Sequence, residues 1–226
     1  MIRMVVFDMA GTVIDEDNVV YKTLRKAINE QGYTVSLELV LSEGGGKEKF
    51  QAIRDILERQ DQVFSPAVAS KIFQYFKTYL AGAYDEMEIR SQPGAEELFR
   101  ELKKKSIYVV LNTGYDLETA QTILNKVRWQ EGREIDALVT ATHVANNRPA
   151  PDMIEFARRK FALTRSDQVV KVGDSAIDIE EGQNAGCHLT IGITTGAQSR
   201  EQIARSGPDY IVDRLMDILP LLNGKN

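Results

Sequence analysis

The feature that most constrains the fold is a regular alternation of short apolar runs with longer amphipathic segments. Six runs have the length and the apolar or β-branched content of buried strands: 2–7, 107–112, 136–141, 168–174, 189–194 and 209–212. Amphipathic helices are predicted at 94–105, 116–128, 151–161, 176–185 and 198–206. Strands that alternate with helices of this length favour an α/β fold in which helices cover a doubly wound parallel sheet.

One long segment, 17–88, departs from this alternation. It contains amphipathic patterns at 18–31, 47–59 and 66–85 but no convincing strand. A run of three glycines, Gly44 to Gly46, interrupts it. We interpret the segment as a helical cap domain that lies over the sheet like a lid, so that 1–16 and 89–226 together form the core domain.

Composition excludes several classes of protein. The chain has 226 residues, of which 43% are hydrophobic and 27% charged, which is typical of a folded domain. A net charge of −5 argues against a nucleic-acid partner, and no apolar run approaches the roughly 20 residues of a membrane span. The single cysteine cannot form an intramolecular disulfide, and the N-terminus lacks a signal-peptide pattern. A cytoplasmic location is therefore expected.

Polar residues occur where the predicted strands end. Asp8 ends the first strand, Thr113 follows the second, Arg148 comes after the third, and Asp174 ends the fourth. In an open parallel sheet, ligands bind beyond the carboxyl ends of the strands. A carboxylate there can act as the nucleophile in phosphoryl transfer, and a second can help to hold Mg²⁺. A guanidinium and a hydroxyl can bind the phosphoryl oxygens.

Each of these residues also has a structural explanation when taken alone. An Asp at a strand end is usually a turn residue or a helix cap, and a lone Arg is usually a surface charge. Polar residues at four consecutive strand ends together favour an active site. A catalytically quiet protein that binds a phosphate or another metabolite in the same pocket is the alternative.

The motifs resemble those of the haloacid dehalogenase superfamily of hydrolases, and the resemblance covers nearly the whole chain. The motifs are VVFDMAGTVID at 5–15, LNTG at 111–114, RPAPDM at 148–153 and VGDSAIDIEEGQNAG at 172–186. The resemblance implies an enzyme with a Rossmann-like core and an α-helical cap inserted between the first and second motifs.

The resemblance also implies roles for the matching acidic positions. Asp8 would be the nucleophile and a metal ligand. The backbone carbonyl of Ala10 and the carboxylate of Asp174 would complete the protein's share of the Mg²⁺ ligands. Asp178 would support these ligands without binding the metal itself.

Further matching positions would contact the substrate. Thr113 would bond the phosphoryl group, and Arg148 would replace the more usual lysine of the third motif. Thr12, Gly114 and Tyr115 are also expected to bind the substrate. The substrate implied is a small phosphonate or phosphate.

The first motif differs from that of most phosphatases in the superfamily, which read DxDGT. Ala10 replaces the second aspartate, and alanine cannot perform a proton transfer that is typically worth about 10²–10⁴-fold in rate. DxAGT instead resembles phosphonoacetaldehyde hydrolase, or phosphonatase, which cleaves a carbon–phosphorus bond. That resemblance implies a cap lysine that condenses with the substrate aldehyde. The spacing Gly44-x-x-Lys47 makes Lys47 the predicted Schiff-base residue.

Some residues of the cap and of the first motif depart from the phosphonatase pattern. Glu43 and Phe50 stand where phosphonatases carry Met and His, so Glu43 is expected beside the substrate. Met9 and Asn18 replace a Trp and a Cys. Hydrolysis of a small phosphate monoester, with a residue such as Glu43 supplying the missing acid, is therefore a further alternative. The phosphonatase resemblance also suggests a homodimer formed through the cap.

Overall fold

A six-stranded parallel sheet forms the core of the computed structural model, which describes residues 1–60 and 65–222. Along the sheet the strand order is β5-β4-β1-β6-β7-β8. The strands are β1 (Met4–Asp8), β4 (Tyr108–Thr113), β5 (Ala137–Thr140), β6 (Val169–Gly173), β7 (Leu189–Ile193) and β8 (Tyr210–Val212). Each corresponds to one predicted run, and the predicted α/β fold class is confirmed.

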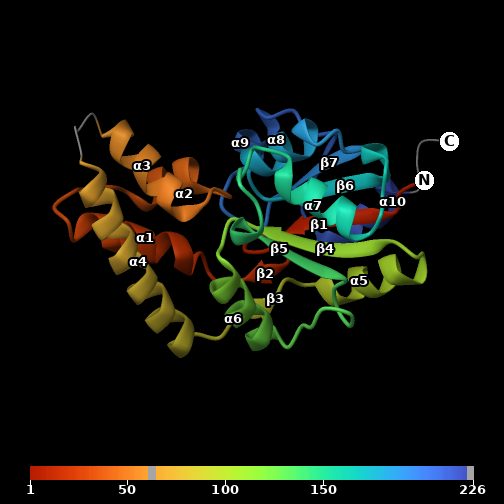
Figure 1. The fold of residues 1–226 in the computed structure, drawn as a ribbon, viewed down its shortest axis with the longest axis horizontal. Helices are drawn as coiled ribbons and strands as arrows, with labels where there is room; N and C mark the ends of the chain where they lie inside the picture. The colour runs from red at the N-terminus through yellow and green to blue at the C-terminus, as the bar shows by residue number, and fades with distance from the viewer. Residues whose placement is uncertain (61–64, 223–226) are drawn as a thin grey trace.

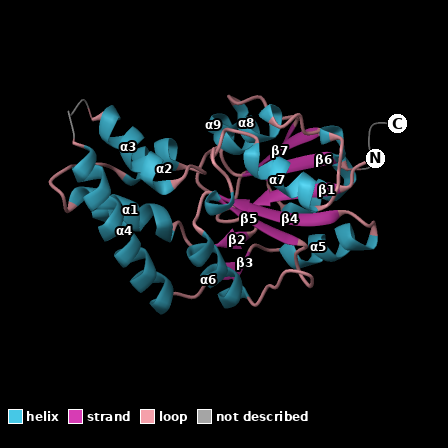
Figure 2. Ribbon diagram, in the orientation of Figure 1, coloured by secondary structure: helices cyan, strands magenta, loops and turns pink. Residues whose placement is uncertain are grey.

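Helices cover both faces of this sheet (Figure 2). They are α5 (Ala95–Lys104), α6 (Leu117–Val127), α7 (Asp152–Lys160), α8 (Ala176–Asn184), α9 (Arg200–Ala204) and α10 (Ile218–Leu221). In β1, Phe7 packs in the same apolar cluster as Phe99 of α5. Val6 belongs to the opposite cluster with Met153 of α7. Because successive side chains of β1 point to opposite covered faces, the strand is apolar from Met4 to Phe7.

The order in which strands are added to the sheet changes direction at β1. From β1 the chain builds β4 and β5 on one side, and then returns to build β6, β7 and β8 on the other. Asp8 at the end of β1 pairs in register with Asn112 of β4, while Phe7 pairs with Val172 of β6. The carboxyl ends of β4, β1 and β6 therefore meet at the point where ligands bind in sheets of this kind.

Four helices form a separate layer beside this edge of the sheet (Figure 1). They are α1 (Val19–Asn29), α2 (Leu37–Gly44), α3 (Lys49–Arg59) and α4 (Pro66–Glu86). Helices α1, α3 and α4 correspond to the three predicted cap helices, whereas α2 was not predicted. Residues 61–64, which fall within the predicted cap segment, lie outside the described part of the chain. No described helix, α4 included, is both long and apolar enough to cross a membrane.

Two short strands lie where the chain enters and leaves the cap. They are β2 (Ile14–Asp15) and β3 (Arg90–Ser91), which pair antiparallel with Ile14 opposite Ser91 and Asp15 opposite Arg90. The exact cap boundaries, 17 and 88, stay a prediction, but both crossings lie side by side at this ribbon.

Candidate active site

Three buried carboxylates gather at the carboxyl ends of β1 and β6. Asp8, Asp174 and Asp178 each offer an oxygen within 4.8 Å of the others. The Thr12 hydroxyl donates to Asp174 Oδ1 at 3.1 Å, and the Ala197 N–H donates to Oδ2 at 2.6 Å. The predicted residues Asp8, Thr12 and Asp174 are therefore brought together, and Asp178 lies within the cluster itself.

This cluster fits a divalent cation. Burial raises the pKa of Asp174 to about 8, and the nearby Asp8 carboxylate contributes to the increase. Burial also raises the pKa of Asp8. Burial would raise the pKa of Asp178 too, but the charges of Arg148 and Lys171 lower it. A hard cation with oxygen ligands would favour ionisation of Asp8 and Asp174, so the donor set suits Mg²⁺.

Arg148 connects the carboxylate cluster to strand β4 and to the cap. Its Nη1 donates to Asp8 Oδ1 at 2.7 Å and to the Gly46 carbonyl at 3.2 Å. Its Nε donates to Glu181 Oε2 at 2.9 Å, and its Nη2 donates to Asn112 Oδ1 at 2.7 Å. All three guanidinium nitrogens are thus engaged, as only the planar fork of arginine allows.

A buried polar network behind the site was not predicted. Lys171 of β6 places Nζ 2.8 Å from Asn112 Oδ1 and 2.9 Å from Asp178 Oδ1. The Asn112 amide donates to both oxygens of Glu181. A lysine within the apolar run 168–174 was a signal in the sequence, since a fully buried lysine requires an acidic partner.

The loop that follows β4 lies directly beneath the cap. Thr113 is buried, and its hydroxyl accepts from the Tyr115 N–H at 3.2 Å. A Cβ added to Gly114 would lie 2.8 Å from the Lys47 carbonyl oxygen. The backbones of the two loops therefore touch, which requires glycine at this position.

The cap loop between α2 and α3 closes on the core at Gly46. This residue has φ +68°, and an added Cβ would lie 2.5 Å from both Ser175 Oγ and Ile177 Cγ2. The Gly46 carbonyl also accepts from Arg148. The structure is therefore one in which the cap is closed over the carboxylates.

Two of the predicted cap residues form ion pairs with other residues of the cap. Lys47 Nζ pairs with Asp55 of α3 at 2.5 Å. Glu43 pairs with Arg59 at 3.0 Å, also within the cap. The amine of Lys47 and the carboxylate of Glu43 are thus each paired within the cap.

Lys49 provides a buried cap amine that the sequence analysis missed. Its Nζ lies 5.3 Å from the ring centroid of Tyr115 and 5.5 Å from that of Tyr21. The ammonium donates to the Lys47 carbonyl. Burial lowers the pKa of Lys49 to about 8, even though the charge of Asp8 raises it. Lys49 is also the first residue of α3, where the helix dipole disfavours a cation.

The triple glycine explains why the sequence indicated the neighbouring lysine. Gly44 to Lys47 and Gly46 to Lys49 have the same G-x-x-K spacing, so the motif alone allows either residue. Helical periodicity distinguishes them. Lys49 lies on the α3 face that also buries Ala52, Ile53, Ile56 and Leu57.

Glu16 is a second buried ionisable group that was not predicted. The Tyr115 hydroxyl donates to its Oε1 at 3.2 Å, and the Tyr84 hydroxyl of α4 donates to Oε2. Burial raises the pKa of Glu16 to about 7, although the two tyrosine hydrogen bonds and the charge of Lys49 act to lower it. No spacing pattern marks Glu16 in the sequence.

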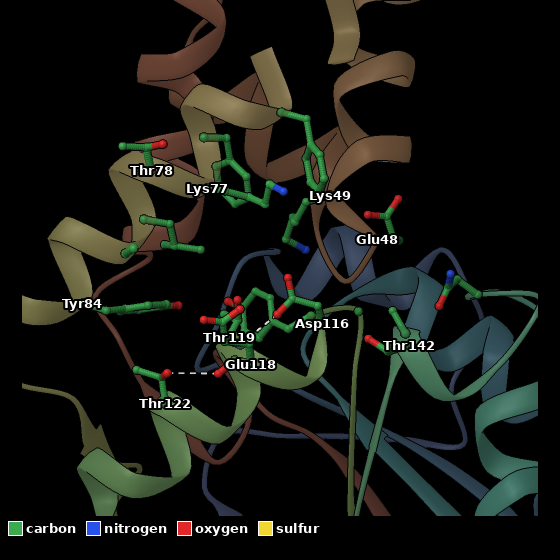
Figure 3. A pocket seen from close by; sticks show the side chains of 18 of the residues that line it. Glu48, Lys49, Lys77, Thr78, Tyr84, Asp116, Glu118, Thr119, Thr122 and Thr142 are labelled. Atoms are coloured by element: carbon green, nitrogen blue, oxygen red, sulfur yellow. Dashed lines mark hydrogen bonds between the residues drawn. The ribbon is translucent and has the colours of Figure 1, made fainter. Parts of the chain in front are cut away.

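A cavity of about 700 Å³ lies between the cap and the core. Lys49, Tyr84, Gly114 and Tyr115 are among its lining residues, while Asp8 is not. Figure 3 shows Lys49 extending from the cap toward the first turn of α6, with Tyr84 pointing in from α4. The cavity therefore borders Lys49 and the loop after β4, whereas the three carboxylates are not among its lining residues.

Comparison with known proteins identifies the family. Residues 5–192 match the family model of haloacid dehalogenase-like hydrolases. The chain belongs to this family. The match spans all four motifs and the cap, and it ends at the penultimate residue of β7. A haloacid dehalogenase-like hydrolase is an enzyme with the Rossmann-like core and cap observed here.

Among members of this family, the chain is similar to several phosphonoacetaldehyde hydrolases. It is 30% identical to the one from Latilactobacillus sakei, over 98% of this chain and 95% of that protein. It is 26% identical to the one from Lactiplantibacillus plantarum, over 100% and 97% of the two chains.

Solved structures of this haloacid dehalogenase-like fold superpose on the whole chain. A hydrolase from Pseudomonas syringae matches with a TM-score of 0.86 at 18% identity, covering 98% of both chains. A phosphonoacetaldehyde hydrolase-like protein from Oleispira antarctica matches with a TM-score of 0.85 at 22% identity, covering 98% of this chain and 91% of the other. At these identities the likeness establishes the fold.

Proposed function

We propose that this hydrolase cleaves the carbon–phosphorus bond of a small phosphonate aldehyde, such as phosphonoacetaldehyde, using Asp8 and Lys49. The observation that carries the proposal is a buried cap lysine close enough for the Asp8 charge to raise its pKa, in a chain with Ala10 at the acid position. The similarity to phosphonoacetaldehyde hydrolases also supports it.

The proposed reaction begins at the aldehyde. The neutral Lys49 amine adds to the carbonyl carbon, and loss of water gives an iminium ion. An Asp8 oxygen then attacks phosphorus, and the electron pair of the breaking carbon–phosphorus bond passes to carbon and is accepted by the iminium as an enamine. No alkoxide leaves, so Ala10 does not need to supply a proton. Water then hydrolyses the aspartyl-phosphate and the enamine.

The remaining site residues would support the phosphoryl group. Arg148, which donates to Asp8, and Thr113 at the end of β4 would bind phosphoryl oxygens as charge develops. Asp8, Asp174 and the Ala10 carbonyl would hold Mg²⁺, with Asp178 beside them. The ion would supply positive charge next to the nucleophile.

Phosphate-ester hydrolysis is less well supported. It would require a proton donor from the cap to replace the aspartate absent at Ala10. Glu43, the predicted donor, pairs with Arg59 instead. Turnover of phosphate monoesters remains one outcome of the test below.

The test is reduction of the enzyme with borohydride in the presence of phosphonoacetaldehyde, followed by peptide mapping. We expect a covalent adduct on Lys49, since borohydride reduces the iminium to a stable amine. Lys49→Ala should lose both the adduct and the activity, whereas Lys47→Ala should keep both. An adduct on Lys47, or activity toward phosphate monoesters that survives Lys49→Ala, would contradict the proposal.

A further inference from the structure

Glu16 lies outside the motifs of the proposed mechanism, yet it belongs to the same buried cluster as Lys49. It follows β2 at the entrance to the cap and is 3% exposed. The Tyr115 hydroxyl donates to one of its oxygens and the Tyr84 hydroxyl to the other. Because both carboxylate oxygens accept from phenols, the cap and the core jointly fix its position.

Tyr115 connects this carboxylate with the amine. Its hydroxyl bonds Glu16 at 3.2 Å, and its ring centroid lies 5.3 Å from Lys49 Nζ. The charge of Lys49 in turn lowers the pKa of Glu16. A single buried side chain therefore contacts both ionisable groups, Glu16 through its hydroxyl and Lys49 through its ring, and places them in one buried cluster.

Titratable and charged side chains from several elements surround Glu16. Tyr84 belongs to α4, Tyr115 to the loop after β4, and Lys49 to α3. From α1, the backbone of Val20 lowers the pKa of Glu16, and the charge of Glu16 raises the pKa of Tyr21. Among these groups of the described chain, Lys49 is the one cation that acts on Glu16.

The proposed Schiff-base chemistry needs a proton acceptor for Lys49. An amine with a pKa of about 8 is mostly protonated at pH 7, and only its neutral form attacks a carbonyl. Phe50 occupies the position of the histidine that the phosphonatase resemblance implies, so that residue cannot serve. Burial raises the pKa of Glu16 to about 7, into the same range as that of Lys49, so Glu16 can accept this proton near neutral pH.

We propose that Glu16 takes the proton that Lys49 must release before attack, and returns it to the oxygen that departs from the aldehyde. This inference rests on the proposed function. The ammonium gives one proton to the Glu16 carboxylate, and the free amine adds to the carbonyl carbon. One amine proton moves to the former carbonyl oxygen, and Glu16 gives its proton to the resulting hydroxyl. Water leaves, and the nitrogen keeps one proton as the iminium.

The test measures the rate of borohydride trapping with phosphonoacetaldehyde between pH 5.5 and about 9. In the unaltered enzyme we expect the rate to fall below a pH of about 7, because protonated Glu16 can no longer accept a proton. Glu16→Gln should lower the rate at pH 7 by about 10²-fold. The loss should shrink near pH 9, where solvent deprotonates Lys49 directly. A purely structural role would give a loss independent of pH.

Two further variants make the test specific. Tyr84→Phe removes a hydrogen bond that lowers the pKa of Glu16, so the acid limb should move to higher pH. This variant keeps Glu16 in place and decides the question even if Glu16→Gln does not fold. Glu30→Gln is the matched control, because Glu30 accepts a tyrosine hydroxyl, that of Tyr79, on the exposed side of the cap. Its trapping rate should be unchanged.

The outcomes separate this inference from the proposed function. Trapping in the unaltered enzyme, with the same rate and pH profile in Glu16→Gln and Tyr84→Phe, would overturn the role of Glu16 and leave the function standing. Absence of any adduct in the unaltered enzyme would overturn both.

Discussion

At the residue scale, Arg148 makes a set of hydrogen bonds that a lysine could not make. Its three nitrogens contact Asp8, Glu181 and Asn112 at the same time, all of them buried. A lysine would keep the charge but offers one donor centre in place of a fork. Arg148→Lys would therefore leave part of Glu181 or Asn112 without a partner, which is costly inside a protein.

We expect Arg148→Lys to lower the free energy of unfolding by at least about 2 kcal/mol and to reduce kcat by about 10²-fold. Urea unfolding followed by circular dichroism measures the first, and steady-state kinetics the second. Arg165→Lys is the matched control, because Arg165 pairs with Asp167 at the exposed surface. Equal changes in the free energy of unfolding and in kcat for the two variants would show that the buried contacts of Arg148 are not responsible.

The sequence predicted some site residues and missed others for a physical reason. Asp8 and Thr113 end strands, and Arg148 and Asp174 come after strands. Parallel strands bring their carboxyl ends to one edge of the sheet, whatever the conformation of the loops. Lys49 and Glu16 reach the site through the closure of the cap, which strand order does not determine. For Lys49, the run of glycines allows the G-x-x-K spacing to be matched either by Gly44 and Lys47 or by Gly46 and Lys49.

At the scale of elements, the loop between α2 and α3 controls how closely the cap approaches the core. Gly46→Ala would place a methyl group 2.5 Å from Ile177 and Ser175, and it would also strain a residue at φ +68°. The cap loop would have to lift, moving Lys49 relative to Asp8. We expect kcat to fall by about 10²-fold, since displacements of this size have such effects on catalysis.

Gly32→Ala provides the matched control for this prediction. Gly32 has φ +90°, but an added Cβ would meet no atom within 4 Å. The strain alone should cost about 1 kcal/mol of stability and leave kcat unchanged. Equal kcat values for the two variants would show that the contact at Gly46 does not govern the site.

The strands were predicted more readily than the cap helices. Runs such as 107–112 have a continuous apolar centre, here Val109 to Leu111, because helices cover both faces of the sheet. Helix α2 has only 8 residues and buries just Val40 and Gly44, so its sequence carries little helical periodicity. Its clearest signal is the Ser36 cap, which accepts from the Leu39 N–H.

At the scale of the whole molecule, the carboxylate cluster links stability to metal binding. A cation bound by Asp8 and Asp174 in the folded state alone stabilises that state, by about 2.7 kcal/mol at a hundred times its dissociation constant. We expect Mg²⁺ to raise Tm by about 5–10 °C in a thermal unfolding scan. Asp174→Asn should abolish this shift. It should also raise the Tm measured with chelator, since it removes a buried carboxylate beside Asp8.

Asp17→Asn is the control for the metal experiment. Asp17 is exposed, and asparagine tolerates its φ of 50°. Its Tm should rise with Mg²⁺ as in the unaltered protein. A shift that persisted in Asp174→Asn would place the ion elsewhere.

Because β2 pairs with β3, the cap joins the core through two adjacent chain segments and can be replaced as a unit. The chain leaves the core at Asp15 and returns at Arg90, and these residues face each other across the ribbon. A two-residue Asn-Gly turn could join them and bypass every cap helix, because such turns close antiparallel pairs. Grafting a different lid onto the same two points would replace Lys49 while Asp8, Arg148 and Asp174 stayed in place. A lineage could thus acquire a new substrate without redesigning the sheet that handles phosphorus.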